Sequence, residues 1–545
     1  MKYKFTSNHL FDYLFLLLIL SLYGINIYFI INLDSLPPKW DEAVHLRDSL
    51  VFHNIISNPS ELSFQVIKDI LNKSDQYPLF RPSGYYPPLV PLLTSLLYFV
   101  SGVSAKAAIM FNIFFLFILV FSVYKIGKLI FDKNTGLLAS ILILLYPIVQ
   151  QQSVIYYLDL PLAAMTALTI FILLKTNYFK STKYSIFAGF LFGFGMLTKW
   201  TFLFFLVGPL CYLAFKTFYK KEEAKLISYS SKSFKNVILF AIFSIATFGI
   251  YYFPILIELI SETFKYSHGR LAQGPNSLFS FASICFYPFS LWNEMITPLG
   301  FILFIIGVVL LVFSKNQHKI LLLIWIIIPY LIFTFVIQTK QPRFMLPWLV
   351  PISLIILFCI SEFRSIILRK ISVTSKVAGI SITAFSLIVF LIFFLIENVK
   401  LRNSIADASK KNWNISEMVS AIEDDIKSKS SYRLNNSINY LGVIPDHHYI
   451  NGQTLRYYAA FKLLPLNVIK VIQHDEAYQE FVRKFDRYDY ILTKDLFNTE
   501  IASFRESIER INKFFFSHLV SFEHLKTFQE PDGSEVSIFK RKNLD

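Results

Sequence analysis

Charged residues are scarce in this chain. Of 545 residues only 16% are charged, whereas 54% are hydrophobic, and the mean hydropathy is +0.51. A composition this apolar excludes an ordinary soluble globular protein. It predicts a polytopic membrane protein, because spans of about 20 apolar residues are what a helix needs to cross the hydrocarbon. Such segments recur from residue 10 to residue 396, and the pattern stops at Glu397.

Cysteine is also scarce. The three cysteines, Cys211, Cys285 and Cys359, lie in or beside apolar segments and show no CxxC spacing. Neither a zinc site nor a disulfide framework is therefore indicated.

Nucleotide-binding and hydrolase motifs are missing as well. The sequence contains no Walker A loop, GxGxxG, HExxH or GxSxG. An enzyme acting outside the membrane, where nucleotide sugars are generally unavailable, would need a donor delivered through the lipid.

The net charge of +15 is a signal of topology rather than of nucleic-acid binding. Basic residues cluster in short loops between apolar segments, and such loops face the cytoplasm. The requirement that all of these basic loops lie on one side of the membrane predicts about eleven transmembrane helices. They are expected near 10–33, 105–131, 136–150, 160–175, 184–199, 201–219, 236–258, 295–314, 319–337, 344–361 and 376–396. Segment 10–33 is expected to be a retained anchor rather than a cleaved signal.

This topology places three regions outside: the first loop 34–104, the loop 259–294 and the tail 397–545. Segment 86–100 would invert every later loop if it were a full span, so it is expected to lie in the interface or to re-enter the membrane. The predicted domains are a transmembrane domain, 1–396, and a soluble external domain, 397–545.

The tail is expected to form a small α/β domain. An amphipathic helix is predicted around Ile415 to Ile426, and strands are predicted at 438–445 and 488–493. This domain either recognises an acceptor or only caps the membrane domain.

Two adjacent carboxylates, Asp41 and Glu42, follow the first apolar segment. Acids beside a span are where proton transfer on a lipid-borne substrate is expected. Pro37-Pro38 begins a helix with an apolar stripe, predicted along the membrane surface, for which Asp41 would be an N-cap. The two roles are compatible, because a helix N-terminus favours the ionised carboxylate that a general base requires.

Asp159, Lys199 and Arg343 lie at the external ends of three other predicted spans. Asp159 could alternatively cap a helix, Lys199 could snorkel, and Arg343 could anchor its span at the interface. Cations are rare on the external side, so these two are candidates for binding a phosphate group. Polar groups from several helices at one membrane face are what a shared site needs.

Two further groups of residues are candidates. His268 and Arg270 lie in a cationic loop that either closes over an anionic headgroup or is an ordinary solvated connection. Tyr86 belongs to a cluster of tyrosines and prolines before segment 86–100. It is either an interface anchor or a sugar-stacking residue.

Five short runs together resemble one family. They are Trp40-Asp-Glu-Ala, Tyr86-Pro-Pro-Leu-Val-Pro-Leu-Leu, Asp159-Leu-Pro-Leu-Ala-Ala, Gly189-Phe-Leu-Phe-Gly-Phe-Gly-Met-Leu-Thr-Lys-Trp200 and Pro342-Arg-Phe-Met-Leu-Pro347. In this order and topology, over most of residues 1–360, they resemble the GT-C membrane glycosyltransferases that use polyprenyl-phosphate sugars, above all the protein O-mannosyltransferase and ArnT-like group. The resemblance implies an all-α GT-C membrane domain with a small external α/β domain.

The resemblance also implies roles. Asp41 would act as the general base of an inverting sugar transfer, and Glu42 would support it. Lys199, Arg343 or Arg270 would stabilise the departing phosphate. Asp159 would bind acceptor or sugar, or hold a divalent cation with Asp41. Metal use stays open, because the sequence offers too few certain oxygen ligands.

One departure from the family concerns Tyr86. Many ArnT-like members carry Lys-Pro-Pro before the interfacial helix, whereas here Tyr86 precedes Pro87-Pro88. The change removes a cationic contact to phosphate and leaves the donor headgroup geometry open.

The implied partners are a polyprenyl-phosphate-linked sugar, a lipid, glycan or protein acceptor, and membrane lipids, but no nucleic acid. The expected location is a bacterial plasma (inner) membrane, with the active site and the C-terminal domain on the periplasmic side. The alternatives are a multi-span transporter or flippase of a lipid-linked sugar, and an inactive scaffold. No repeat of two halves supports the transporter.

Overall fold

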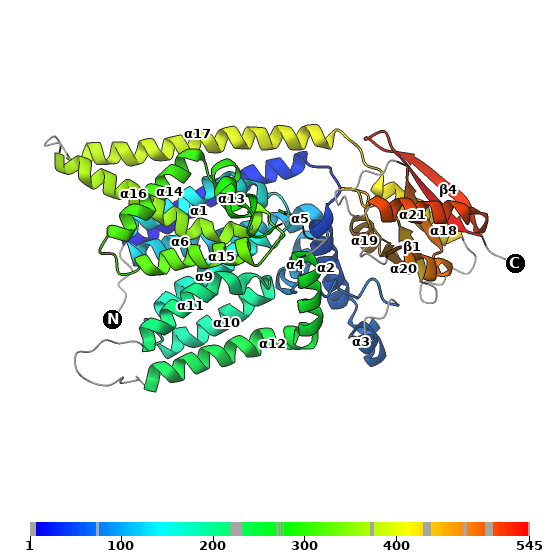
Figure 1. Cartoon of the computed structure of the whole chain (residues 1–545), viewed down its shortest axis with the longest axis horizontal. Helices are drawn as coiled ribbons and strands as arrows, with labels where there is room; N and C mark the ends of the chain where they lie inside the picture. Colours follow the sequence, from blue (N-terminus) through cyan, green and yellow to red (C-terminus); the bar gives the residue numbers. More distant parts are fainter. Residues whose placement is uncertain are drawn as a thin grey trace. The chain divides into compact units, whose positions relative to one another are not determined.

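The computed structural model describes residues 7–71, 76–218, 231–268, 272, 274–275, 277–370, 375–428, 438–471, 477–495 and 505–542 (Figure 1). The chain divides into two compact units. The first combines Met1–Ile31 with Ile109–Asn403, and the second combines Asn32–Ala108 with Ser404–Asp545. The loop after the first helix thus belongs to the same unit as the C-terminal part. The domain boundary at residue 397 stays a prediction.

All secondary-structure elements among the described residues of the first unit are helices. Its elements are α1 (Ser7–Leu33), α6 (Asn112–Ile130), α7 (Lys133–Leu142), η2 (Ile143–Leu145), α8 (Pro147–Ser153), α9 (Asp159–Lys175), α10 (Thr182–Thr198), α11 (Phe202–Phe218), α12 (Ser231–Ser267), α13 (Phe281–Ser290), η4 (Leu291–Met295), α14 (Pro298–Phe313), α15 (Lys319–Phe335), η5 (Pro342–Trp348), α16 (Leu349–Lys370) and α17 (Ser375–Ser409). Each of the predicted spans overlaps helices of this set, so the helical membrane architecture is confirmed.

Four of the described helical segments are long and apolar enough to cross a membrane alone. They are Leu10–Leu33, Ala105–Ile130, Lys232–Lys265 and Pro342–Arg364. Lys133–Leu145 and Pro147–Ser153 form a fifth if counted together, and they are bent by 65° at the break. The bend has a local cause: Tyr146 precedes Pro147 and takes an extended conformation, φ −73° and ψ 136°, because proline disfavours the helical conformation in the residue before it.

Close packing of α10 on α12 depends on small residues. A Cβ atom at Gly193 would lie 2.3 Å from Cβ of Thr247, and one at Gly189 would lie 2.6 Å from the backbone oxygen of Phe240. Glycines spaced by four residues let two apolar helices approach closely. This contact fixes α10, whose end carries Lys199.

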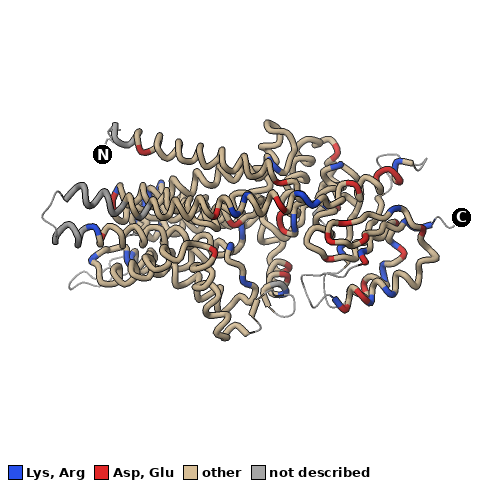
Figure 2. Tube along the Cα trace, turned by 90° about the horizontal axis from the view of Figure 1, so that it is seen from above, with Lys and Arg blue, Asp and Glu red and all other residues tan. Residues whose placement is uncertain are grey.

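The second unit contains α2 (Trp40–Ser57), η1 (Pro59–Glu61), α3 (Phe64–Leu71), α4 (Leu89–Ser101), α5 (Ala105–Met110), α18 (Ile415–Ser428), α19 (Gly452–Phe461), α20 (Ala477–Arg483), η6 (Phe485–Arg487), α21 (Arg505–Ser517) and η8 (Leu519–Ser521). Its strands are β1 (Asn439–Val443), β2 (Leu466–Lys470), β3 (Tyr490–Lys494), β4 (Phe522–Gln529) and β5 (Glu535–Arg541). Figure 2 shows that charged residues are dense over these C-terminal elements and sparse along the helices of the first unit.

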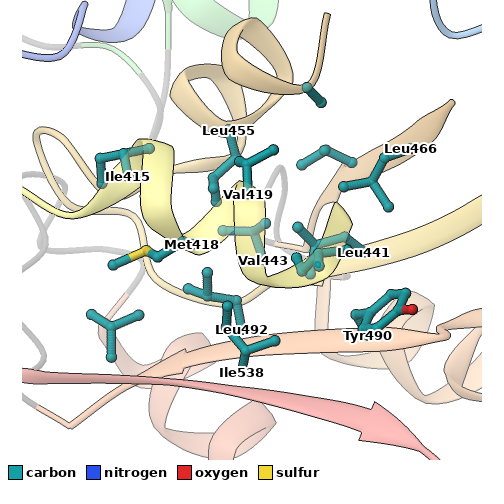
Figure 3. Close-up of a cluster of buried hydrophobic side chains, with 14 of the residues drawn as sticks. Ile415, Met418, Val419, Leu441, Val443, Leu455, Leu466, Tyr490, Leu492 and Ile538 are labelled. Atoms are coloured by element: carbon teal, nitrogen blue, oxygen red, sulfur yellow. The ribbon is translucent and has the colours of Figure 1, made fainter. Parts of the chain in front are cut away.

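The five strands form one sheet in the order β2-β1-β3-β5-β4. β1 is parallel to β2 and β3, and β5 is antiparallel to β3 and β4. Alternate residues of the strands, such as Leu441 and Val443, pack against α18 and α19 (Figure 3). On the other face Phe539 packs against Phe515 of α21. The predicted helix at 415–426 and the predicted strands at 438–445 and 488–493 are confirmed as α18, β1 and β3.

The helix that begins near Pro37-Pro38 is confirmed as α2, and its position along a membrane surface stays a prediction. Residues from Ala43 to Val51 are mostly buried, and α2 packs against α4 and α19 within the second unit. Segment 86–100 forms α4, an apolar helix of 13 residues. At about 1.5 Å per residue it is too short to cross the hydrocarbon.

Candidate functional site

The first cluster of predicted site residues surrounds the carboxylate of Asp159. Lys199 places its Nζ 2.6 Å from Oδ1 of Asp159, and Arg343 places Nη1 3.6 Å from Oδ2. The Asp159 side chain is 1% exposed, while Lys199 and Arg343 are 12% and 13% exposed. Three residues that are distant in sequence therefore meet in a largely dry ion cluster within the first unit.

Each of the three lies where a helix begins or ends. Asp159 is the first residue of α9, whose N-cap is Leu158, so the alternative in which Asp159 caps the helix is wrong. Lys199 follows α10 in an extended conformation, φ −160° and ψ 132°. Arg343 lies in η5, directly after Pro342.

Aromatic rings hold the two cations. The guanidinium carbon of Arg343 lies 4.0 Å from the ring centroid of Tyr157, and Nζ of Lys199 lies 5.0 Å from that of Phe344. Nε of Arg343 also donates to Oε1 of Gln341 at 2.6 Å. Stacking on aromatic faces stabilises cations in partly desolvated sites, so the guanidinium plane of Arg343 is fixed from two sides.

Two cations of this cluster face one carboxylate, and Lys199 is its closer partner. Oδ2 of Asp159 accepts no hydrogen bond from the described residues. A buried carboxylate oxygen that accepts no hydrogen bond can accept one from a hydroxyl group.

A third cation, Lys340, lies three residues before Arg343 and has a structural role. Nζ of Lys340 donates to the backbone oxygens of Phe333, Thr334 and Ile337 at 2.7, 3.1 and 2.9 Å. It therefore satisfies carbonyls at the end of α15. Burial lowers the pKa of Lys340 to about 8.

The second cluster surrounds Asp41 and lies in the second unit. Asp41 is the second residue of α2, and the hydroxyl of Tyr86 donates to its Oδ1 at 2.8 Å. The Tyr86 ring also meets the His45 ring edge to face, with centroids 4.4 Å apart. The N-cap of α2 is Lys39, so Asp41 does not cap the helix. The partial positive charge of the helix N-terminus nevertheless favours its negative charge.

The loop that carries Tyr86 is tied to α2 by buried polar contacts. Asp48 accepts hydrogen bonds from the backbone N–H of Ser83, at 2.9 Å, and from its hydroxyl. Arg47 donates to the backbone oxygen of Arg81. Burial raises the pKa of Asp48, an effect that Arg47 and Ser83 oppose. These contacts hold Tyr86 at a fixed height along α2.

Glu42 faces another partner. Burial is the largest cause that raises the pKa of the Tyr457 hydroxyl, and the charges of Tyr458 and Glu42 raise it further. Glu42 thus lies near α19, whereas Asp41 is held by the loop before α4. Adjacent carboxylates on one helix turn point to different surroundings.

The remaining predicted site residues stand apart. Nδ1 of His268 pairs with Oγ of Ser267 at 2.7 Å, and its ring stacks on Phe264 at 4.7 Å. No described contact joins His268 to Asp159. Arg270 lies outside the described residues.

The donor set does not fit a divalent cation. Among the described residues no three His, Cys, Asp or Glu side chains lie close enough to hold a metal ion. Asp159, the carboxylate proposed for this purpose, already faces Lys199 and Arg343. The positive charges of Lys199 and Arg343 beside this carboxylate repel a dication.

Several residues near these clusters carried little signal in the sequence. Phe344 lies within one of the runs quoted above, and Tyr157 lies two residues before another. Adjacency to Asp159 and Arg343 was their only signal. His448 and Lys470, which contact the residue before Asp41, lie more than 400 residues along the chain and carried none.

Comparisons with known proteins give a family match over part of the chain and a fold match over most of it. The family described as dolichyl-phosphate-mannose-protein mannosyltransferase matches residues 86–244, less than a third of the chain. No curated protein matches the sequence.

Solved structures match over nearly the whole chain. The crystal structure of ArnT from Cupriavidus metallidurans bound to undecaprenyl phosphate has a TM-score of 0.58 and 10% identity, covering 96% of this chain and 98% of that one. AglB, an archaeal oligosaccharyltransferase from Archaeoglobus fulgidus in complex with an inhibitory peptide and a dolichol-phosphate, has a TM-score of 0.50 and 14% identity, covering 97% and 74%. The chain has the GT-C fold, which confirms the resemblance seen in the sequence, and it is an integral membrane protein.

Proposed function

We propose that this protein is an inverting glycosyltransferase that moves a sugar from a polyprenyl-phosphate donor to a hydroxyl of a lipid, glycan or protein acceptor on the external face of the membrane. The observation that carries the proposal is the carboxylate of Asp41, held by Tyr86 at the positive end of α2. Two GT-C proteins similar in fold were solved with undecaprenyl phosphate and dolichol-phosphate, which supports a lipid-linked donor.

Asp41 acts as the general base. Its ionised carboxylate takes the proton of the acceptor hydroxyl as the acceptor oxygen attacks the anomeric carbon of the sugar. The bond between that carbon and the phosphate oxygen breaks, and the electron pair leaves with the polyprenyl phosphate. A single displacement of this kind inverts the anomeric centre. Glu42 supports the acidic site, and Tyr86 orients Asp41.

Arg343 and Lys199 bind the donor phosphate and stabilise the charge that grows on it as it leaves. Of the two, Arg343 contributes more, because Lys199 is nearly neutralised by Asp159 at 2.6 Å. The planar guanidinium also suits the paired oxygens of a phosphate.

Asp159 serves two purposes. It fixes both cations, and its Oδ2 accepts a hydrogen bond from a hydroxyl of sugar or acceptor. His268 and Arg270 are assigned to the donor headgroup through their loop. The external part 397–545 contacts the acceptor or covers the membrane domain, on the periplasmic side of a bacterial inner membrane.

The test is an assay of the purified wild-type protein in lipid nanodiscs against a panel of polyprenyl-phosphate sugars and acceptors. Release of polyprenyl phosphate and transfer of the sugar with inverted anomeric configuration are expected. A retained configuration would contradict single displacement. In vesicles, translocation of a lipid-linked sugar without any transfer would favour the flippase instead.

A further inference from the structure

The residue before Asp41 has an unusual backbone. Trp40 has φ of +39°, in the left-handed region, where bulky side chains are rarely found. Such a conformation persists only when surrounding contacts enforce it.

Two residues of the C-terminal part contact the indole, and a third anchors one of them. Nε1 of Trp40 donates to Nδ1 of His448 at 3.4 Å, and Nζ of Lys470 lies 5.3 Å from the centroid of the indole ring. Lys470 is itself anchored by Oδ1 of Asp446 at 3.0 Å, and Asp446 is 2% exposed. We call Asp446, His448 and Lys470 the Trp40 clamp.

The residues before Trp40 are held by the same part of the chain. The hydroxyl of Thr454 donates to the backbone oxygen of Pro38 at 3.0 Å. Nζ of Lys39 lies 5.0 Å from the ring centroid of Tyr449. The entry into α2 is thus fixed by residues 446–470, all within the second unit.

We infer that the Trp40 clamp positions the proposed base Asp41, so that the C-terminal part sets the catalytic geometry of a motif more than 400 residues away; this inference rests on the proposed function. Asp41 is then held from two sides. Tyr86 fixes its carboxylate, and the clamp fixes the backbone from which its side chain departs.

The contacts differ from those of ordinary core packing. Trp40 is half-buried and does not belong to the hydrophobic cluster that joins α18 and α19 to the sheet. Its partners are a histidine nitrogen and a lysine anchored by a buried carboxylate. Directional contacts of this kind fix an orientation, whereas apolar packing alone mainly fixes a volume.

The test uses Trp40→Phe, which loses the indole N–H, and Trp40→Leu, which loses the aromatic ring as well. Trp413→Phe is the control, because Trp413 lies in the same unit and phenylalanine keeps an aromatic ring for the packing on His447 and Tyr449. Donor cleavage is measured per folded molecule, with folding followed by thermal unfolding.

Misplacement of a catalytic group can lower a rate by about 100-fold. Trp40→Leu is expected to lower kcat by about 10- to 100-fold and to leave the donor KM within about twofold of the wild-type value. Trp40→Phe is expected to lower kcat by a smaller factor, and Trp413→Phe is expected to leave kcat unchanged. A lower unfolding midpoint with unchanged kcat per folded molecule would overturn the positioning role.

An independent readout separates this inference from the proposed function. Amide hydrogen exchange of a peptide covering residues 40–46 is expected to rise at least about tenfold in Trp40→Leu and to stay unchanged in Trp413→Phe. If the wild type cleaves no donor while this exchange pattern holds, the proposed function fails but the clamp on α2 stands. If exchange does not change in Trp40→Leu, the clamp itself is wrong.

Discussion

Lys199 and Asp159, 40 residues apart, share a short ion pair in which Nζ lies 2.6 Å from Oδ1. Both side chains are largely removed from solvent, so the pair must be balanced to be tolerated. The second cation, Arg343, places Nη1 3.6 Å from Oδ2 of the same carboxylate. The cluster joins the start of α9, the end of α10 and η5.

Breaking the pair on one side only is expected to destabilise the fold. Lys199→Met leaves the buried Asp159 carboxylate with a single, more distant partner, which should lower the free energy of unfolding by about 3–5 kcal/mol. Thermal unfolding in detergent measures the loss. The double variant Asp159→Asn with Lys199→Met should recover most of the lost free energy of unfolding. A double variant whose loss equals the sum of the losses of the two single variants would contradict the pairing.

Arg343→Lys is expected to weaken donor binding while preserving charge. Lysine loses the planar contact with Tyr157 and the paired geometry for phosphate, so the donor KM should rise about tenfold. Lys340→Met is the matched control, because that cation serves backbone carbonyls. Its unfolding midpoint should fall while its donor KM stays unchanged. Equal effects of both variants on the donor KM would remove the phosphate role of Arg343.

Tyr86→Phe should impair the reaction more than the fold. The variant keeps the ring against His45 but loses the hydrogen bond to the Asp41 carboxylate, a bond worth about 1.5–3 kcal/mol when one partner is charged. We expect kcat to fall by about 10-fold with little change in donor KM. Unaltered kcat would show that Tyr86 does not orient the base.

Much of the fold was predictable from the sequence. Apolar length and loop charge located the helices of the first unit, and the short apolar run at 86–100 indicated a helix too short to span, α4. The alternation around Leu441 and Tyr490 predicted β1 and β3. Each of these depends on local pattern alone.

The surroundings of α2 were not predictable. Its apolar stripe fits a helix on a membrane surface as well as one buried against α4 and α19, because periodicity reports that a face is covered but not by what. The contacts of Trp40 with His448 and Lys470 join ends of the chain that no local pattern connects.

The candidate site was partly predictable for the same reason. Charge parity placed Asp159, Lys199 and Arg343 at one set of helix ends, and the structure joins them. The ion pairs among them could not be predicted, because each residue alone also fits an ordinary role as a helix cap, a snorkelling cation or an interface anchor. Asp41 and Glu42 are adjacent in sequence, yet one faces Tyr86 and the other lies towards Tyr457.

The C-terminal part should show a pH dependence that one buried carboxyl controls. Burial raises the pKa of Glu530 from 4.5 to about 7, despite hydrogen bonds from Asn414. The folded state therefore binds this proton more tightly than the unfolded state, and its contribution to stability is complete below pH 4.5 and is lost as the pH rises to about 7.

Thermal unfolding followed by a C-terminal probe from pH 4.5 to 7.5 measures this effect. Glu530→Gln, which cannot ionise at this position, should show a smaller decline of the unfolding midpoint as the pH rises over that range. Asp532 provides the contrast: although burial opposes it, hydrogen bonds from Ser534 and Lys494 lower its pKa to about 2, so its contribution is lost only at more acidic pH. An unchanged slope in Glu530→Gln would contradict the assignment.

The role of Asp41 as the base is the central claim, and Asp41→Asn tests it most directly. Asparagine keeps the size of the side chain and can still accept from Tyr86, but it cannot take the acceptor proton. Glu61→Gln, an exposed acid in η1 of the same unit, is the matched control. Single-turnover transfer from a polyprenyl-phosphate sugar should fall by about 100- to 10,000-fold in Asp41→Asn, with donor binding retained and the control unaffected. Wild-type transfer by the folded Asp41→Asn protein would contradict the account.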